Sequence, residues 1–421
     1  MTVGRGDGID VGTLLELVEA AAPVEAVDAV AAALAEMADA REVSFLIADF
    51  SGRAIVRLST VANGRDGTRS TGVERAETVP LPGSRFERVL RSQQPEVEPV
   101  DDAWRVTAPV TDRGDAIGLL EFVLPTEPPP DVVAEVCTAA HALGYVVIAA
   151  RRHTDLFEWG QRSAPFAMAA EIQRRLLPAA YTCEAGQFTL AGWLEPAASV
   201  GGDTFDYTLD RSCLHLSISD AVGHQVPAAL LATLLVGGLR NGRRRGMDLA
   251  EQAAYAGRAL AAEATPGQFV TGQLLRVDLR TAAAQIVNAG HPFPLRLRDG
   301  RVEEVELAID PPFGVTPETP FRVQSFPLEP GDRLVFLTDG MQERNAASLD
   351  VAAALADTAD LHPREVVHEL GGAVLRATGG DLRDDATMLC LDWLGGPQRR
   401  RDTEHGADPA RASGPVPTSH S

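Results

Sequence analysis

The sequence predicts an α+β protein whose second half is a sandwich of two antiparallel sheets. The chain has 421 residues, 45% of them hydrophobic, which is enough for two or three domains with full cores. From Phe188 onward, short strand patterns occur in runs and the helical patterns are grouped between them, which favours antiparallel α+β order over alternating βαβ units. The pair Asp299-Gly300 between two alternating apolar runs is a strong hairpin signal.

Residues 1–130 predict a smaller α/β domain. Two Ala-rich helices, broken at Pro23, fill residues 10–40. The alternating patterns that follow predict four strands, with a polar loop over 63–77 between the second and the third; the strands are expected at 42–48, 53–58, 104–110 and 116–124. Residues 131–178 then predict a helical linker with one interruption near Pro165.

The linker repeats apolar residues at three- and four-residue spacing, as at Val132, Val136 and Leu143. Such a segment can pack against its copy in a dimer, or it can be an ordinary helix packed on its own domain. Residues 179–394 are the expected sandwich domain. Residues 395–421 are rich in Gly, Pro, Arg and Ser, which predicts a disordered tail.

The formal net charge of −21 argues against a general nucleic-acid or anionic-membrane binder, which needs clustered Lys and Arg. The four cysteines are scattered with no Cys-x-x-Cys pair, as expected of reduced core thiols. No signal peptide is visible, and the longest apolar run, Ala139–Ala150, is too short to span a bilayer. A cytoplasmic location is therefore expected.

Aspartates beside glycine, or beside a second aspartate, follow or precede apolar strands at four places in the second half. These places are Val200-Gly-Gly-Asp203, Asp220-Ala-Val-Gly-His224, Thr338-Asp-Gly340 and Arg383-Asp-Asp-Ala-Thr387. Glycine lets the backbone turn tightly and approach a ligand. Aspartate supplies hard oxygen ligands, which suit Mg²⁺ or Mn²⁺ and disfavour Zn²⁺. Four such turns in one domain predict a divalent-metal site.

The segment from about Ala167 to Asp392 resembles the bacterial SpoIIE/RsbU-type branch of the metal-dependent PPM serine/threonine protein phosphatases. The residues that carry the resemblance are, in order, EIQRRLLP, EPAASVGGDTFDY, SISDAVGHQVPAALLA, VNAGHPFPL, PPFGV, LEPGDRLVFLTDGMQE and RDDATML. The resemblance implies a PPM-type α-β-β-α sandwich with two Mn²⁺ or Mg²⁺ ions at one edge. Such a pair would activate a bridging water and align its attack on phosphorus.

The same resemblance assigns roles to single residues. Asp203 and Asp220 match the metal-bridging carboxylates, and the main-chain carbonyl of Ala221 completes one site. Asp339 and Asp384 match the ligands of the second metal. Two further residues match positions beside the metals without binding them: Gly202 and Asp385.

Two histidines lie close to the acidic turns in the sequence. His224 and His291 could each protonate the leaving serine or threonine oxygen, or could simply tie a loop by hydrogen bonds; His224 is taken as the catalytic candidate. The family's usual Gly-His-Gly reads Gly223-His224-Gln225 here. If Gln225 must adopt a left-handed backbone, the cost is about 1 kcal/mol, and every metal ligand stays in place.

The N-terminal part, ending in DRGDAIGLLEFVLP, is similar to GAF-type sensor domains, although a regulatory module without a small-molecule ligand fits equally well. The resemblances together imply a phosphatase acting on phosphoserine or phosphothreonine of an anti-sigma-factor antagonist of the STAS type. Its N-terminal domain would receive a ligand or an upstream regulator, and a homodimer is possible. The alternative is a catalytically silent scaffold of the same fold that signals by partner binding. A nucleotide cyclase also uses paired Asp, but antiparallel strand runs are not its pattern.

Overall fold

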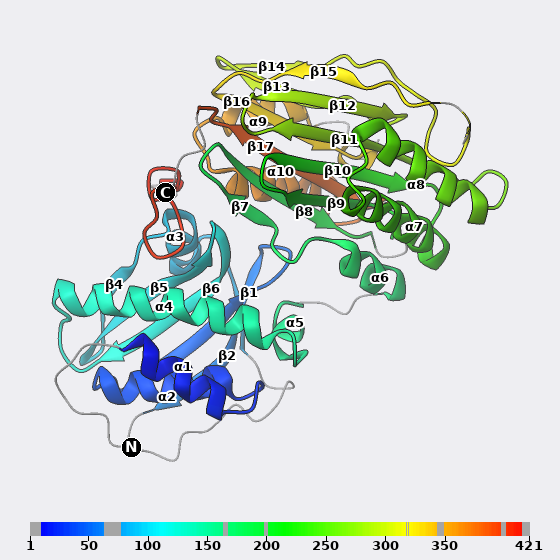
Figure 1. Cartoon of the computed structure of the whole chain (residues 1–421). Coiled ribbons are helices and arrows are strands. Elements are labelled where there is room, and N and C mark those ends of the chain that lie inside the picture. Colours follow the sequence, from blue (N-terminus) through cyan, green and yellow to red (C-terminus); the bar gives the residue numbers. More distant parts are fainter. Residues whose placement is uncertain are drawn as a thin grey trace. The chain divides into compact units, whose positions relative to one another are not determined.

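The computed structural model describes residues 10–62, 77–162, 167–197, 201–316, 318, 320–342, 349–396 and 401–414. The chain divides into two compact units (Figure 1), with residues 1–165 and 402–421 in the first and residues 166–401 in the second. Most of the loop expected over 63–77, and the interruption expected near Pro165, lie outside the described residues.

The first unit is built on one six-stranded antiparallel sheet with the strand order β3-β2-β1-β6-β5-β4. The strands are β1 (Glu42–Ala48), β2 (Ala54–Ala62), β3 (Glu77–Pro80), β4 (Glu96–Val100), β5 (Ala103–Asp112) and β6 (Asp115–Leu124). The sequence predicts β1, β2, β5 and β6 but not the two edge strands β3 and β4, which are short and rich in Glu and Pro.

The two faces of this sheet are covered by different helices. Val43, Phe45 and Ile47 of β1 belong to the main core, which the sheet shares with α1 (Val11–Ala20), α2 (Ala26–Met37), α4 (Pro130–Ala150) and α5 (Leu156–Gly160). Leu46, between them in the sequence, belongs to a smaller cluster with α3 (Arg85–Ser92) on the other face. The alternation of side chains along a strand thus gives the sheet two separate cores.

The segment expected to be a helical linker is divided between the two units. Helix α4 lies in the first unit, where Val136, Leu143 and Val147 are buried in the main core. Helix α6 (Met168–Leu176) lies in the second unit. By length and composition alone α4 is long and apolar enough to cross a membrane, unlike the shorter run at 139–150 considered from the sequence, and 44% of its most apolar window is buried within the protein.

The tail also differs from the disordered segment expected over 395–421. Residues 401–414 are described, and Ala407, Asp408 and Ser413 are buried. The backbone nitrogen of Gly114, in the β5–β6 turn, donates to the Gly406 carbonyl at 3.0 Å. Gly406 has φ +96, and a Cβ there would lie 2.0 Å from the Thr111 carbonyl oxygen. A glycine that can approach another backbone closely therefore lets the tail pack on the first unit.

The second unit contains two antiparallel sheets. A five-stranded sheet has the order β15-β12-β11-β10-β9, and a six-stranded sheet has the order β14-β13-β16-β17-β8-β7. The strands are β7 (Thr182–Glu184), β8 (Phe188–Glu195), β9 (Thr204–Leu209), β10 (Cys213–Ala221), β11 (Val270–Asp278), β12 (Ala283–Ala289), β13 (Leu295–Arg298), β14 (Arg301–Glu304), β15 (Gln324–Pro327), β16 (Asp332–Leu337) and β17 (Ala386–Trp393).

Three apolar layers hold this unit together. Phe188, Phe205 and Trp393 are among the residues that fill the space between the two sheets. Helices α7 (Gln225–Arg244) and α8 (Leu249–Glu263) pack on the outer face of the five-stranded sheet, whereas α9 (Val351–Asp357) and α10 (Pro363–Ala377) pack on the six-stranded sheet. Figure 1 shows these layers in helix–sheet–sheet–helix order. The predicted α-β-β-α sandwich is confirmed.

Candidate active site

The four acidic turns lie at strand ends contributed by both sheets of the second unit. Asp203 directly precedes β9 and Asp220 lies in the last two residues of β10, both in the five-stranded sheet. Asp339 opens the short 3-10 helix η2 (Asp339–Gln342) after β16, and Asp384 precedes β17, both beside the six-stranded sheet. The carboxylate of Asp220 interacts electrostatically with Asp339 and Asp384. The fold therefore brings the predicted ligands of both sheets to one edge of the sandwich.

Asp203 is the most buried member of this group, with 1% of its surface exposed. The hydroxyl of Thr338 donates a hydrogen bond to Asp203 Oδ2 at 2.7 Å. Burial, with smaller contributions from Asp220 and Asp385, raises the pKa of Asp203 well above its usual range. A carboxylate in such a place needs a compensating positive charge or a proton, because an isolated buried charge is very costly.

Asp385 anchors the loop that carries Asp203. Its Oδ1 accepts a hydrogen bond from the backbone nitrogen of Ala197 at 2.9 Å, and its Oδ2 accepts one from Gly202 at 3.0 Å. The side-chain nitrogen of Gln173, in α6, donates to Asp385 Oδ2 at 2.6 Å and to the Asp203 carbonyl at 2.8 Å. Burial raises the pKa of Asp385, and these hydrogen bonds oppose the rise. Asp385 thus positions the ligand loop, as expected from its place beside the ligands.

Two glycines explain why the acidic turns carry glycine. A Cβ on Gly202 would lie 2.5 Å from the Ala221 carbonyl oxygen, and a Cβ on Gly340 would lie 1.9 Å from the Asp385 carbonyl oxygen. Both separations are too short for any side chain. The Gly-Asp and Asp-Gly pairs are therefore more than turn signals, since they let neighbouring strand ends approach closely, β9 and β10 in one sheet and β16 and β17 in the other.

The electrostatics of the edge fit a divalent cation. Burial, together with Asp339, Asp384 and Asp385, raises the pKa of Asp220 to about 7. A cation bound by carboxylate oxygens would relieve this repulsion, and the Ala221 carbonyl adds a further oxygen to the donor set. Such an oxygen-only set suits Mg²⁺ or Mn²⁺.

The predicted ligands are gathered but not tightly clustered. Among the described residues, the one triad of Asp, Glu, His or Cys whose ligand atoms all lie within 4.8 Å is Asp210, Cys213 and His215, in the β9–β10 hairpin. Backbone nitrogens of Ser212 and Cys213 donate to Asp210 Oδ1 at 2.7 Å, so this aspartate closes a turn. The predicted ligands of the acidic edge do not form such a triad among the described residues.

The two histidines have different surroundings. His291 is 2% exposed, its backbone nitrogen donates to Asn288 Oδ1 at 2.8 Å, and the Asn288 side chain donates to the His291 carbonyl at 3.0 Å. Burial lowers the pKa of His291 to about 3, so this neutral histidine ties its loop and is a poor proton donor. His224 is exposed at the N-cap of α7. The next residue, Gln225, has φ 62, the left-handed backbone considered from the sequence.

Three residues of the site were missed by sequence reasoning: Gln173, Thr338 and Thr387. Thr338 Oγ1 accepts from the backbone nitrogen of Thr387 at 3.1 Å while it donates to Asp203, so it joins β16, β17 and the ligand loop. A threonine next to the Asp339-Gly340 pair and a glutamine in a helical pattern carry no signal of their own. Only the closeness of the two sheets gives them a role.

Comparisons with known proteins find similarity over the second half of the chain. Residues 210–394 match the family model described as Stage II sporulation protein E (SpoIIE). The chain is 20% identical over 235 residues to the phosphoserine phosphatase RsbU of Bacillus subtilis (strain 168), covering 53% of this chain and 68% of RsbU. It is 23% identical over 194 residues to the phosphoserine phosphatase RsbP of the same organism, covering 45% of this chain and 47% of RsbP.

Two solved structures align with part of the chain. The RsbU and RsbW domains of a Mycobacterium tuberculosis protein are 26% identical at a TM-score of 0.44, covering 51% of this chain and 62% of that one. The SiaA-PP2C domain of Pseudomonas aeruginosa is 22% identical at a TM-score of 0.44, covering 53% of this chain and 93% of that one. Most of the second unit thus matches the SpoIIE family model, and the chain is similar to the phosphoserine phosphatases RsbU and RsbP.

Proposed function

We propose that this chain is a metal-dependent protein serine/threonine phosphatase that hydrolyses phosphoserine or phosphothreonine on a regulatory protein. The observation that carries the proposal is the meeting of acidic turns from both sheets, where burial and like charges raise the pKa of Asp220 to about 7. Two Mn²⁺ or Mg²⁺ ions would supply an activated water and neutralise phosphate charge when bound. Asp203, Asp220, Asp339, Asp384 and the Ala221 carbonyl are the proposed ligands.

The residues of this chain would each contribute to the site in a defined way. The hydrogen bond from Thr338 fixes Oδ2 of Asp203. The loop that Asp385 anchors would orient the other carboxylate oxygen of Asp203. Exposed His224 is the candidate to donate a proton to the departing oxygen, whereas the buried His291 would hold its loop. The roles of Thr338, Asp385 and His291 rest on hydrogen bonds and burial, whereas that of His224 rests on its exposure beside the Asp220 turn. None of these roles requires a protein nucleophile.

Mutation of the central carboxylate tests the proposal. The full chain is assayed for hydrolysis of p-nitrophenyl phosphate and of a phosphorylated protein across a manganese titration. Asp220→Asn should abolish manganese-dependent turnover, because it removes a proposed ligand from both metals. Asp357→Asn, a change at an exposed aspartate at the end of α9, should retain turnover. Wild-type turnover in Asp220→Asn would reject the site assignment.

The natural substrate we propose is a phosphorylated anti-sigma-factor antagonist of the STAS type. Support comes from the similarity to RsbU and RsbP, which are themselves named phosphoserine phosphatases. Incubating the full chain with candidate phosphorylated antagonists, with and without manganese, should release phosphate from one of them only when the metal is present. A sensor role for the first unit, a homodimer and a cytoplasmic location stay predictions.

A catalytically silent scaffold is the second candidate. The left-handed Gln225 favours it, because a distorted loop beside Asp220 could weaken metal binding. Retention of all four acidic turns counts against it, since a scaffold would not need them. A chain that binds its partner but shows no manganese-dependent turnover under any condition would establish the scaffold and reject the enzyme.

A further inference from the structure

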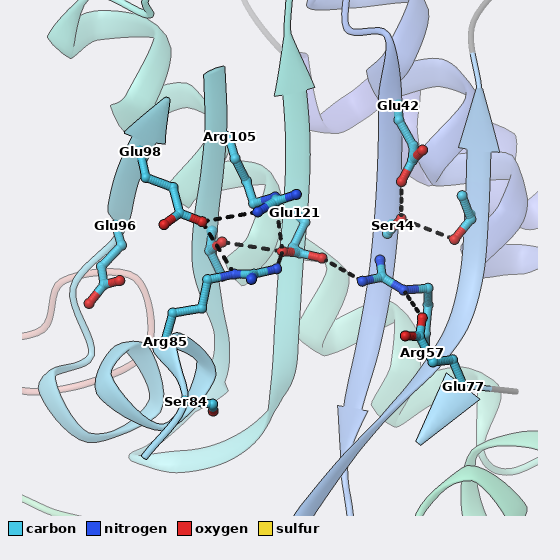
Figure 2. Close-up of polar contacts among 12 residues, drawn as sticks. Glu42, Ser44, Arg57, Glu77, Ser84, Arg85, Glu96, Glu98, Arg105 and Glu121 are labelled. Atoms are coloured by element: carbon cyan, nitrogen blue, oxygen red, sulfur yellow. Dashed lines mark hydrogen bonds and ion pairs between the residues drawn. The ribbon is translucent and has the colours of Figure 1, made fainter. Parts of the chain in front are cut away.

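In the first unit, the face of the sheet that packs on α3 also carries a network of charged side chains (Figure 2). Its centre is Glu121 of β6, whose side chain is 5% exposed. In the register of the sheet, Glu121 lies opposite Ser44 of β1 on one side and Thr107 of β5 on the other. A carboxylate in the middle of a sheet face and this deeply buried must be paired with positive charge.

Three arginines from three elements converge on this single carboxylate. Arg57 of β2 lies 3.0 Å from Glu121 Oε2, Arg85 at the start of α3 lies 2.8 Å from Oε1, and Arg105 of β5 lies 3.6 Å from Oε1. Figure 2 shows the three guanidinium groups around Glu121. One carboxylate can neutralise only one of them, so three cations minus one anion leave a local excess of two positive charges.

Two outer glutamates balance that excess at present. Glu98 Oε1 lies 3.0 Å from Arg105 Nη1 and 3.5 Å from Arg85 Nε, and Glu77 Oε2 lies 3.2 Å from Arg57 Nε. The Glu98 side chain is 37% exposed and the Glu77 side chain 64%, so both can turn into solvent at little cost. Arg85 Nε is buried and makes no hydrogen bond with any described residue.

We infer that this face binds a phosphate-bearing small anion, which replaces Glu98 and Glu77 against the three arginines. A phosphate monoester carries a charge between about −1.5 and −2 at neutral pH, which matches the excess of two positive charges. Its several oxygens can accept hydrogen bonds from planar guanidinium groups in pairs, including the donor of Arg85 that lacks an acceptor. Buried Glu121 would hold the arginines in place and would not contact the ligand.

A closed ion-pair network that only stabilises the fold is the competing explanation, and Glu98 separates the two. If Glu98 merely stabilises the fold, Glu98→Gln weakens the protein and creates no binding. If Glu98 occupies the place of a ligand, Glu98→Gln removes a competitor and strengthens anion binding. The two explanations therefore predict opposite consequences of the same substitution.

The experiment measures binding of inorganic phosphate to the full chain by isothermal titration calorimetry. EDTA is present so that no metal-dependent site takes up the probe, and ionic strength is held constant with chloride. Succinate serves as the dicarboxylate arm. Arg85→Gln is the test variant. Arg88→Gln is the matched control, because Arg88 lies on the same helix, α3, but pairs with Glu96 of β4. Arg105→Gln replaces Arg85→Gln should the latter not fold.

Wild type should bind phosphate saturably, and Arg85→Gln should lower the affinity at least about tenfold, the effect of losing a charge-assisted hydrogen bond. Glu98→Gln should raise the affinity several-fold, and Arg88→Gln should leave it unchanged. The inference is overturned if wild type shows no saturable binding, if Glu98→Gln does not bind more tightly, or if Arg88→Gln weakens binding as much as Arg85→Gln. Stronger binding of succinate than of phosphate would reject the phosphate assignment.

Discussion

Replacing Gln173 with leucine tests whether α6 holds the acidic edge in place. The side-chain nitrogen of Gln173 donates at 2.6 Å to Asp385 Oδ2 and at 2.8 Å to the Asp203 carbonyl, and the residue is 1% exposed. Leucine has a similar volume and no donor, so Gln173→Leu deletes both hydrogen bonds with little change in packing. Asp385 Oδ2 keeps the backbone nitrogen of Gly202 at 3.0 Å.

The expected loss has two parts. Leaving a buried carboxylate oxygen and a buried carbonyl short of a donor costs about 1–3 kcal/mol of unfolding free energy. Because Asp385 positions the loop that carries Asp203, the manganese concentration for half-maximal turnover should also rise, by about 10- to 100-fold, as is usual when a residue that orients metal ligands is lost. Urea unfolding of the full chain measures the first part, and a manganese titration of turnover measures the second.

Gln252→Leu is the matched control. Gln252, in α8, is also buried and donates to the Met247 carbonyl at 2.7 Å, and neither residue belongs to an acidic turn. It should lose a similar amount of stability with no change in manganese dependence. If Gln173→Leu behaves like this control, with an unaltered manganese requirement, the positioning role of α6 is refuted.

Three further predictions concern the same edge. Gly340→Ala should remove manganese-dependent turnover, because its Cβ would meet the Asp385 carbonyl, whereas Gly237→Ala in α7, with nothing within 4 Å, should preserve turnover. Folding raises the pKa of Asp220 from 3.8 to about 7, so the metal-free fold disfavours the ionised carboxylate. The free energy of unfolding should therefore fall as pH rises from about 4 to 7. Manganese binds the ionised form, so calorimetry should show that it raises Tm more at pH 8 than at pH 6. Gln225→Gly should raise the free energy of unfolding by up to about 1 kcal/mol by relieving the left-handed backbone, and a lower stability in urea would contradict this.

The layers of the second unit were predictable because its strands have clear boundaries in the sequence. The predicted hairpin at Asp299-Gly300 is confirmed, since this pair connects the antiparallel strands β13 and β14. The acidic turns were predictable for the same reason, since each is an Asp beside a Gly or a second Asp at a strand end. What the sequence could not provide is the pairing of the sheets, and therefore the roles of Gln173 and Thr338.

The first unit shows where sequence signals were present but unused. Helix α3 was not predicted, although Ser84 and Glu87 form an N-terminal capping pair, with the Ser84 hydroxyl accepting from the Glu87 backbone nitrogen at 3.2 Å. The packed tail had no such signal. Its composition is typical of disorder. Position 406 requires glycine only because its backbone lies so close to the Thr111 carbonyl that a Cβ would not fit. Long-range backbone approach leaves no pattern in local sequence.

The most direct test of the central claim is anomalous diffraction from a crystal of the full chain soaked in manganese. We expect manganese density among the carboxylates of Asp203, Asp220, Asp339 and Asp384, with these side chains drawn together relative to the metal-free chain. Density elsewhere, or carboxylates that stay apart in excess manganese, would contradict the proposed metal centre and with it the phosphatase mechanism.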